Sequence, residues 1–161
     1  MEMEKANQNH TDDRRRAVSR HTLTYILCSI SELFRHYDFD PLDLLIIHAI
    51  LNANVIVIMK DATLDDKFGS IDTVEPDEIK QRISRAAIAR FLSLPLETIR
   101  RRVDRLIHQE VLIEKIDGII VSQSNQFKFG NNRELQTINA HLVRKLLRDL
   151  RRVGVRGPDD L

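Results

Sequence analysis

Residues 84–121 contain two short stretches with helical spacing, a break between them at Ser93-Leu94-Pro95, and then two β-branched runs. Few folds accommodate this order. Ser84 is a suitable N-cap for a first helix that ends at Leu92, and the alanines of this helix allow a second helix to approach closely. The second helix is predicted from about Leu96 to Gln109. The sequence therefore predicts two helices joined by a turn of three or four residues.

The two β-branched runs that follow flank Asp117-Gly118. Asp-Gly between such runs is a strong hairpin signal, because both central positions of a type I′ turn need a positive φ. We therefore expect a hairpin over residues 111–121, with Asp117 and Gly118 at its tip. Only Lys115 offers a positive charge there, against Glu114 and Asp117, so we expect the hairpin to be mainly structural.

The second helix carries four arginines, and helical geometry predicts where they point. If Ile99 faces the core, a step of about 100° per residue places Arg100 and Arg102 beside the buried seam. The positions expected to point outward are Glu97, Thr98, Arg101, Asp104, Arg105 and His108. A guanidinium group fits the O6 and N7 acceptors of guanine, or a phosphate. The face is therefore suited to a DNA major groove, although a solvated basic surface has a similar pattern.

The stretch from about Ile83 to Val121 resembles the winged helix-turn-helix regulators of the MarR and GntR type. Its Ala-rich first helix and its Thr- and Arg-rich second helix, over Ile83 to Val103, carry the resemblance. Helical regions before and after this core look more similar to the MarR arrangement, whose members are bacterial dimers joined through terminal helices. The resemblance implies a cytoplasmic transcriptional regulator that binds double-stranded DNA as a homodimer, with the helix at 96–109 in the major groove.

Under this hypothesis Thr98, Arg101 and Arg105 lie nearest the bases, and Arg85, Arg100 and Arg102 lie nearer the backbone. The full set of candidate DNA-binding residues is Arg85, Pro95, Glu97, Thr98, Arg100, Arg101, Arg102, Arg105 and Lys115. The alternative is a winged-helix module that binds an acidic protein partner without DNA sequence specificity.

Charge is distributed unevenly along the chain, although the formal net charge is only +1. Residues 82–108 contain seven arginines against two acids, and residues 133–156 contain seven basic residues against two acids. Residues 61–80 reverse this pattern, with seven acids against two lysines. Segregated positive charge is typical of a protein with a polyanionic partner.

The remaining organisation follows from spacing and composition, and the predicted fold class is mainly α. Residues 1–18 are polar and are expected to be a disordered tail. Residues 19–60 are expected to form a helical pair, whose second helix begins at Asp40-Pro41 and runs to about Lys60. Its end at Val55–Ile58 is compatible with helix or strand. An acidic flexible linker (61–80), the winged core (81–123) and a C-terminal helix (131–153) follow.

Both terminal helical regions have apolar stripes that need a partner. The first stripe includes Leu23, Ile26, Leu27 and Ile30, and the last includes Leu135, Ile138, Leu142 and Leu146. We expect these stripes to form a dimer interface, while a helix that folds back on its own domain is the alternative.

Enzyme chemistry finds little support in the sequence. It has no Gly-rich phosphate loop and no Cys-x-x-Cys or His-x-x-x-His pair, so no catalytic residue, metal ligand or cofactor is predicted. His48 is expected to be an ordinary buried histidine or the lining of an unknown effector pocket. The single cysteine, Cys28, is expected to be inert rather than a redox sensor. With no secretion signal and no membrane span, a cytosolic protein is expected.

Overall fold

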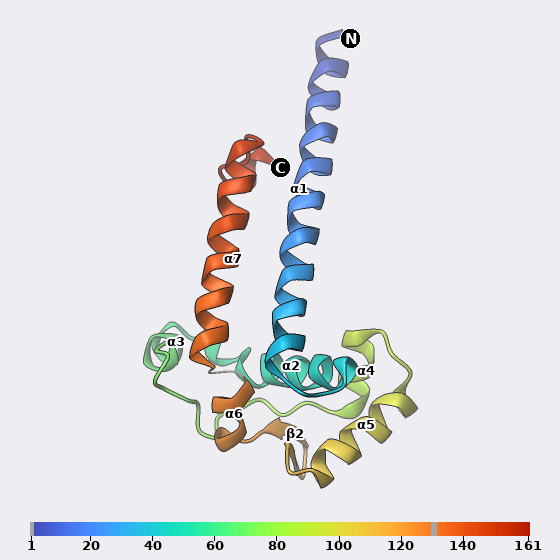
Figure 1. The fold of residues 1–161 in the computed structure, drawn as a ribbon, viewed down its shortest axis with the longest axis vertical. Helices are drawn as coiled ribbons and strands as arrows, with labels where there is room; N and C mark the ends of the chain where they lie inside the picture. The colour runs from blue at the N-terminus through green and yellow to red at the C-terminus, as the bar shows by residue number, and fades with distance from the viewer. Residues whose placement is uncertain (1, 130–131) are drawn as a thin grey trace. The chain divides into compact units, whose positions relative to one another are not determined.

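The computed structural model describes residues 2–129 and 132–161, and it is mainly helical with one small antiparallel sheet, as expected (Figure 1). The chain divides into two compact units. One unit is Tyr37–Arg133, which we call the central unit. The other, the terminal unit, combines the residues up to His36 with Glu134–Leu161.

The elements follow one another as in Figure 1. The terminal unit contains α1 (Glu2–His36), α7 (Arg133–Arg152, whose first residue belongs to the central unit) and a 3-10 turn at Pro158–Asp160. The central unit contains α2 (Pro41–Val55), a 3-10 turn at Ile58–Lys60, α3 (Ala62–Phe68), α4 (Arg85–Leu92), α5 (Leu96–His108), β1 (Leu112–Lys115), β2 (Gly118–Val121) and α6 (Gln123–Phe129).

Helix α2 forms the middle of the central unit. It begins as predicted, because the Asp40 carboxylate accepts hydrogen bonds from the amides of Leu42 and Asp43, and Pro41 occupies the first turn. It is packed by α4, α5, α6 and β2. The fully buried core side chains come from α2, α4, α5, β1 and β2: Leu44, Ile46, Ile47, Ile50, Ile88, Ile99, Val103, Leu106, Leu112, Ile119, Ile120 and Val121.

Three boundaries differ from the sequence predictions. Helix α2 ends at Val55, and a turn and a 3-10 turn at Ile58–Lys60 follow instead of helix or strand. The expected acidic linker contains α3, because Asp61 accepts hydrogen bonds from the amides of Thr63 and Leu64 and so caps a helix.

The third difference is at the N-terminus, where α1 extends back to Glu2 through the segment expected to be a disordered tail. Residues 2–18 contain no Gly or Pro to end a helix, and adding residues to an existing helix is far easier than nucleating one. Residue 131, where the C-terminal region was expected to begin, lies outside the described residues, and α7 starts at Arg133.

Helices α4 and α5 confirm the predicted pair. Ser84 caps α4 by accepting a hydrogen bond from the amide of Ala87 at 3.2 Å. The chain leaves α4 through Ser93, which has a left-handed backbone (φ 54°), and enters α5 after Pro95. Helices α4 and α5 are thus joined by the short turn that the sequence predicted.

The hairpin also forms where it was predicted, but its tip is shifted by one residue. Lys115 pairs with Gly118, so Ile116 and Asp117 occupy the central positions of the turn. Neither has a positive φ, so the expected type I′ turn centred on Asp117-Gly118 is wrong. The cause is a third short segment: Ile119 exchanges backbone hydrogen bonds with Ile83 and fixes β2 from its other side.

Gly118 is required by this arrangement. Its φ is +148°, and a Cβ there would lie 3.0 Å from the backbone N and O of Ile83. We expect Gly118→Ala to lower the free energy of unfolding by about 1 to 3 kcal/mol, because the alanine would be strained and would push the hairpin from Ile83. Urea unfolding measures this. Gly157→Ala is the control, since its Cβ would meet no atom within 4 Å; equal losses for both variants would contradict the packing argument.

A buried amide joins α2 to the hairpin. The Asn54 side chain donates a hydrogen bond to the carbonyl of Gln81 at 2.7 Å and accepts one from the amide of Val121 at 3.0 Å. Its backbone carbonyl also accepts from Gln81 N. Asn54 is almost completely buried, and it therefore satisfies backbone groups that the core would otherwise leave without partners.

In the terminal unit α1 and α7 run antiparallel to each other (Figure 1). The hydroxyl of Tyr25 donates to the Asn139 side chain at 3.0 Å, and His36 pairs with Glu134 at 3.5 Å. Among the described side chains of these two helices, none is fully buried. Within the described residues, no helix combines the length and apolarity that crossing a membrane requires.

Candidate nucleic-acid interface

Helix α5 has one buried face and one exposed face. Ile99, Val103 and Leu106 are completely buried, which confirms the inward face deduced from Ile99. The exposed side chains on the helix are Glu97, Arg100, Arg101, Asp104, Arg105 and His108, while Thr98 and Arg102 are half-buried. Thr98 therefore lies nearer the seam than predicted, and Arg100 lies further out.

Two of the four arginines are anchored to the start of α2. Arg102 donates to Asp40 at 2.6 Å and to Asp43 at 2.9 Å, and Arg105 donates to the second oxygen of Asp43. The side chain of Asp43 is only 6% exposed. Its hydrogen bond to Arg102 raises the pKa of that guanidinium. These contacts hold α5 against α2 and fix the direction of both arginines.

Arg85 is anchored in a second cluster. Its guanidinium donates to Asp104 of α5 at 2.6 Å and to Glu114 of β1 at 2.5 Å. The hydrogen bond from Arg85 lowers the pKa of Glu114, which favours the charged form of this carboxylate. Arg85 thus links α4, α5 and the hairpin. Its guanidinium group, which the sequence assigned to a DNA backbone contact, is already bound by two carboxylates.

Arg101 has a different environment. It is exposed, and among the described residues none forms an ion pair or hydrogen bond with it. Among the described residues, Arg100 pairs only with Glu97, three residues earlier in the same helix, at 3.6 Å, and both side chains are more than half exposed. Such surface pairs contribute little and are easily exchanged. Arg100 and Arg101 therefore remain available to bind a polyanionic partner.

The other predicted residues surround this face. Pro95 is exposed at the N-cap of α5 and leaves the first turn without a side-chain cap. Lys115 is exposed near the hairpin tip. Beside it Asp117 accepts a hydrogen bond from Arg82, which lowers the pKa of this carboxyl group. Both acids near the hairpin tip are therefore paired with arginines of the same unit, a pairing that the sequence count did not include.

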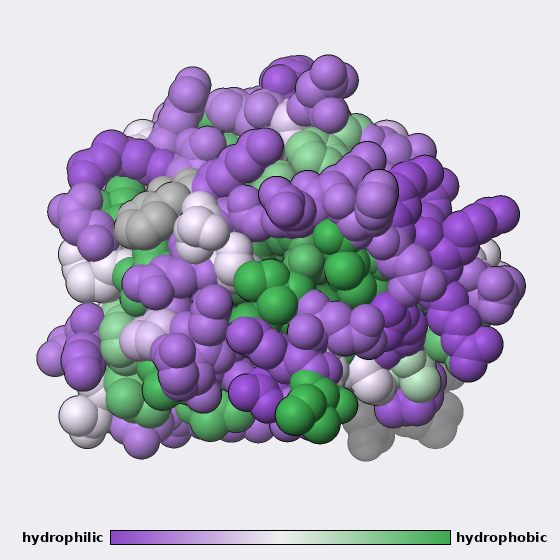
Figure 2. Space-filling model, turned by 90° about the horizontal axis from the view of Figure 1, so that it is seen from below, coloured by the Kyte–Doolittle hydropathy of each residue, from purple (hydrophilic) through white to green (hydrophobic). Residues whose placement is uncertain are grey.

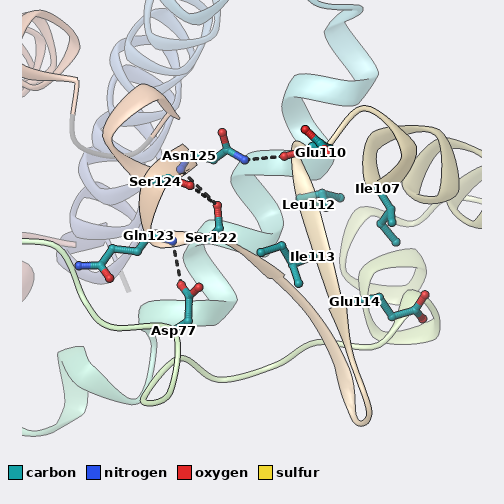
Figure 3. Close-up of a pocket in the computed structure, with 10 residues that line it drawn as sticks. All are labelled: Asp77, Ile107, Glu110, Leu112, Ile113, Glu114, Ser122, Gln123, Ser124 and Asn125. Carbon is teal, nitrogen blue, oxygen red and sulfur yellow. Dashed lines mark hydrogen bonds between the residues drawn. The ribbon is translucent and has the colours of Figure 1, made fainter.

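Figure 2 shows the molecule from the side of α5, α6 and the hairpin, with hydrophobic groups near the centre of a largely hydrophilic surface. An open hollow of about 900 Å³ lies beside β1 on the central unit. It is lined by Asp77, Ile107, Glu110, Leu112, Ile113, Glu114, Ser122, Gln123, Ser124 and Asn125 (Figure 3).

The polar groups in this hollow already bond one another. Asn125 donates to the carbonyl of Glu110 at 2.7 Å, Ser122 and Ser124 share a hydrogen bond, and Asp77 accepts from the amide of Gln123 at 2.8 Å (Figure 3). A specific small-molecule site needs a few polar groups that converge on the ligand. The hollow is therefore a weaker candidate than the exposed face of α5.

The two single residues considered from the sequence, His48 and Cys28, are weaker candidates for a functional site than the exposed face of α5. His48 is half-buried and bonds the carbonyl of Leu44 through Nδ1, and burial lowers its pKa. Cys28 is exposed on α1. In the part of the chain that the structure describes, no group of three or more His, Cys, Asp or Glu side chains is arranged to hold a metal ion.

Sequence reasoning missed the anchoring roles of Asp40 and Asp43. It identified them only as residues that favour the start of α2, and nothing in the local pattern indicates partners about sixty positions later. It also gave no role to Ile116, which is the most exposed of the large hydrophobic residues described, at 107% relative exposure. A β-branched residue directly before Asp-Gly was the available signal.

Comparison of the chain with protein-family models, with curated proteins and with solved structures gives no match.

Proposed function

We propose that the protein binds double-stranded DNA as a homodimeric winged helix-turn-helix regulator, with α5 in the major groove. The observation that carries the proposal is the surface of α5: three residues anchor its inner face in the core, and its outer face presents to solvent Arg100 and also Arg101, which has no polar partner among the described residues. Guanidinium groups on an exposed helix suit both guanine edges and phosphates.

The order of elements supports a winged helix. Helix α4, a turn and α5 are followed directly by the β1–β2 hairpin, and Ile83 adds a short third segment to the sheet. The anchors of Arg85, Arg102 and Arg105 support the same function, because a recognition helix must be held firmly for its side chains to meet bases in a fixed geometry.

Binding to mixed genomic DNA fragments tests the function. Mobility shifts measured between about 50 and 200 mM salt are expected to show affinity that falls steeply with salt, because bound phosphates release counterions. A subset of fragments is expected to remain bound when unrelated DNA is added as competitor. If no fragment is shifted at the lowest salt, DNA binding is excluded, and a winged-helix module for an acidic protein partner becomes the better account.

A second copy of the chain is the proposed partner of the terminal unit. Leu23, Ile26 and Leu27 of α1 and Leu147 of α7 are each about half exposed, at 48% to 56%. Two helices whose described side chains are all at least partly exposed do not form a stable core, whereas joining four of them buries both stripes. A two-fold dimer also presents two α5 helices to half-sites about 34 Å apart.

Leu27→Glu is therefore expected to convert the dimer to a monomer, because the substitution places a charge in the proposed interface. Light scattering coupled to size exclusion measures the mass of one or two 18.7 kDa chains. Met59→Glu is the control, since Met59 is similarly exposed but belongs to the central unit. A wild-type monomer, or a Leu27→Glu dimer, would contradict the proposed interface.

A further inference from the structure

The hairpin tip has an unusual composition for a tight turn. Ile116 occupies the first central position, between Lys115 and Asp117, and it is fully exposed. Turn positions favour Gly, Pro, Asn, Asp and Ser, and a β-branched residue there has no local advantage. Since Ile116 packs against none of the described residues of the central unit, its presence contributes nothing visible to the fold.

Both acids near Ile116 are held in ion pairs, and Arg85 is shared between Glu114 and Asp104. Glu114 is bound by Arg85, and Asp117 is bound by Arg82. Lys115, in contrast, has no polar partner among the described residues and is exposed. The tip therefore combines one free cation with one bare aliphatic side chain.

The hairpin is also held rigidly. Ile119 is bonded to Ile83 through two backbone hydrogen bonds of 3.2 and 2.9 Å, and Gly118 fits closely against the same residue. An ion pair between Arg82 and Asp117 also joins the turn to the segment before α4. A rigid tip loses little conformational entropy when it binds, which favours insertion into a narrow site.

From these observations we infer that the hairpin tip enters the DNA minor groove and inserts Ile116 against the base steps, while Lys115 binds a phosphate. This inference rests on the proposed DNA binding. The minor groove is only about 6 Å wide, so it admits the end of a two-residue turn but not a helix. Its walls are phosphates, which match Lys115, and aliphatic wedges inserted there unstack base steps and bend the duplex.

Ile116→Ala tests the wedge without affecting the fold, because the side chain is fully exposed. On fragments that the wild-type protein binds, the variant is expected to lose roughly tenfold in affinity, as the burial of one isoleucine side chain is lost. Fluorescence energy transfer between the duplex ends is expected to show a bend of some tens of degrees with wild-type protein. That bend should be absent with Ile116→Ala and retained with Ile116→Leu.

Two further variants separate charge from shape. Lys115→Ala is expected to reduce the dependence of log affinity on log salt by about one, with the bend preserved. Met59→Ala, which removes another exposed apolar side chain of the central unit, should change neither affinity nor bend.

The failures are distinguishable. If wild-type protein binds DNA but leaves it straight, or if Ile116→Ala binds and bends it as well as wild type does, the wedge is excluded and the proposed function stands. A change of oligomeric mass in Ile116→Ala would likewise exclude the wedge, because it would place the tip in a protein interface. If wild-type protein binds no DNA, both the inference and the proposed function fail.

Discussion

Replacing Arg101 with alanine is expected to weaken specific DNA binding by about 1 to 3 kcal/mol, or roughly five- to 150-fold, and to relax base preference at one position. Arg101 is exposed, lies on the outer face of α5 and has no polar partner among the described residues. Its loss therefore removes a DNA contact and no internal one. Equilibrium binding and selection of bound fragments measure the two effects.

Thermal stability separates this effect from a folding defect. Arg101→Ala should unfold within a degree or two of wild type, because exposed side chains without partners contribute little. Arg101→Lys keeps the charge but loses the planar fork, so it should retain affinity for unrelated DNA and lose selectivity. Arg90→Ala is the control, because it removes the same charge from an exposed position on α4. If Arg101→Ala keeps full affinity and selectivity, Arg101 does not read DNA.

The largest effect on stability is expected at Asn54. Asn54→Ala leaves the amide of Val121 and the carbonyl of Gln81 without their buried partner. An unsatisfied buried group costs about 1 to 3 kcal/mol, so we expect a loss of about 2 to 4 kcal/mol in the free energy of unfolding. Urea denaturation followed by circular dichroism measures this loss.

Asn52→Ala provides a matched control, because it removes the same amide from the exposed side of the same helix. Its effect should lie within about 0.5 kcal/mol. Similar losses for Asn52→Ala and Asn54→Ala would show that helix propensity, and not the connection between α2 and the hairpin, determines the result.

The sequence predicted the parts of the fold that depend on local signals. Ser84 and Asp40 cap helices as expected, Pro95 precedes α5, and placing Ile99 toward the core gave the buried face correctly. Each of these depends on residues within one or two turns of helix. Local pattern was therefore sufficient for them.

Contacts between distant segments were beyond local patterns. The hairpin tip shifted by one residue because Ile83, more than thirty positions earlier, pairs with Ile119. Residues counted as free charges, such as Arg85 and Arg102, prove to be bound by acids from other elements. A charge count along the chain predicts a basic region but not which of its arginines remain available.

The candidate DNA-binding residues differ in whether acids of the same unit already bind them. The sequence offered nine candidate residues and ranked six of them by expected distance from the bases, and the structure divides them by their partners. Arg85, Arg102 and Arg105 are held by Asp40, Asp43, Asp104 and Glu114, while Arg101 and Lys115 have no such partner among the described residues.

The most direct test of the account is nuclear magnetic resonance of the isotope-labelled chain during titration with a bound DNA duplex. We predict that the backbone amides of α5, from Leu96 to His108, and the side-chain Nε–H of Arg101 shift as DNA is added. If these signals stay unchanged at saturating DNA while signals elsewhere move, the outer face of α5 is not the DNA-binding surface.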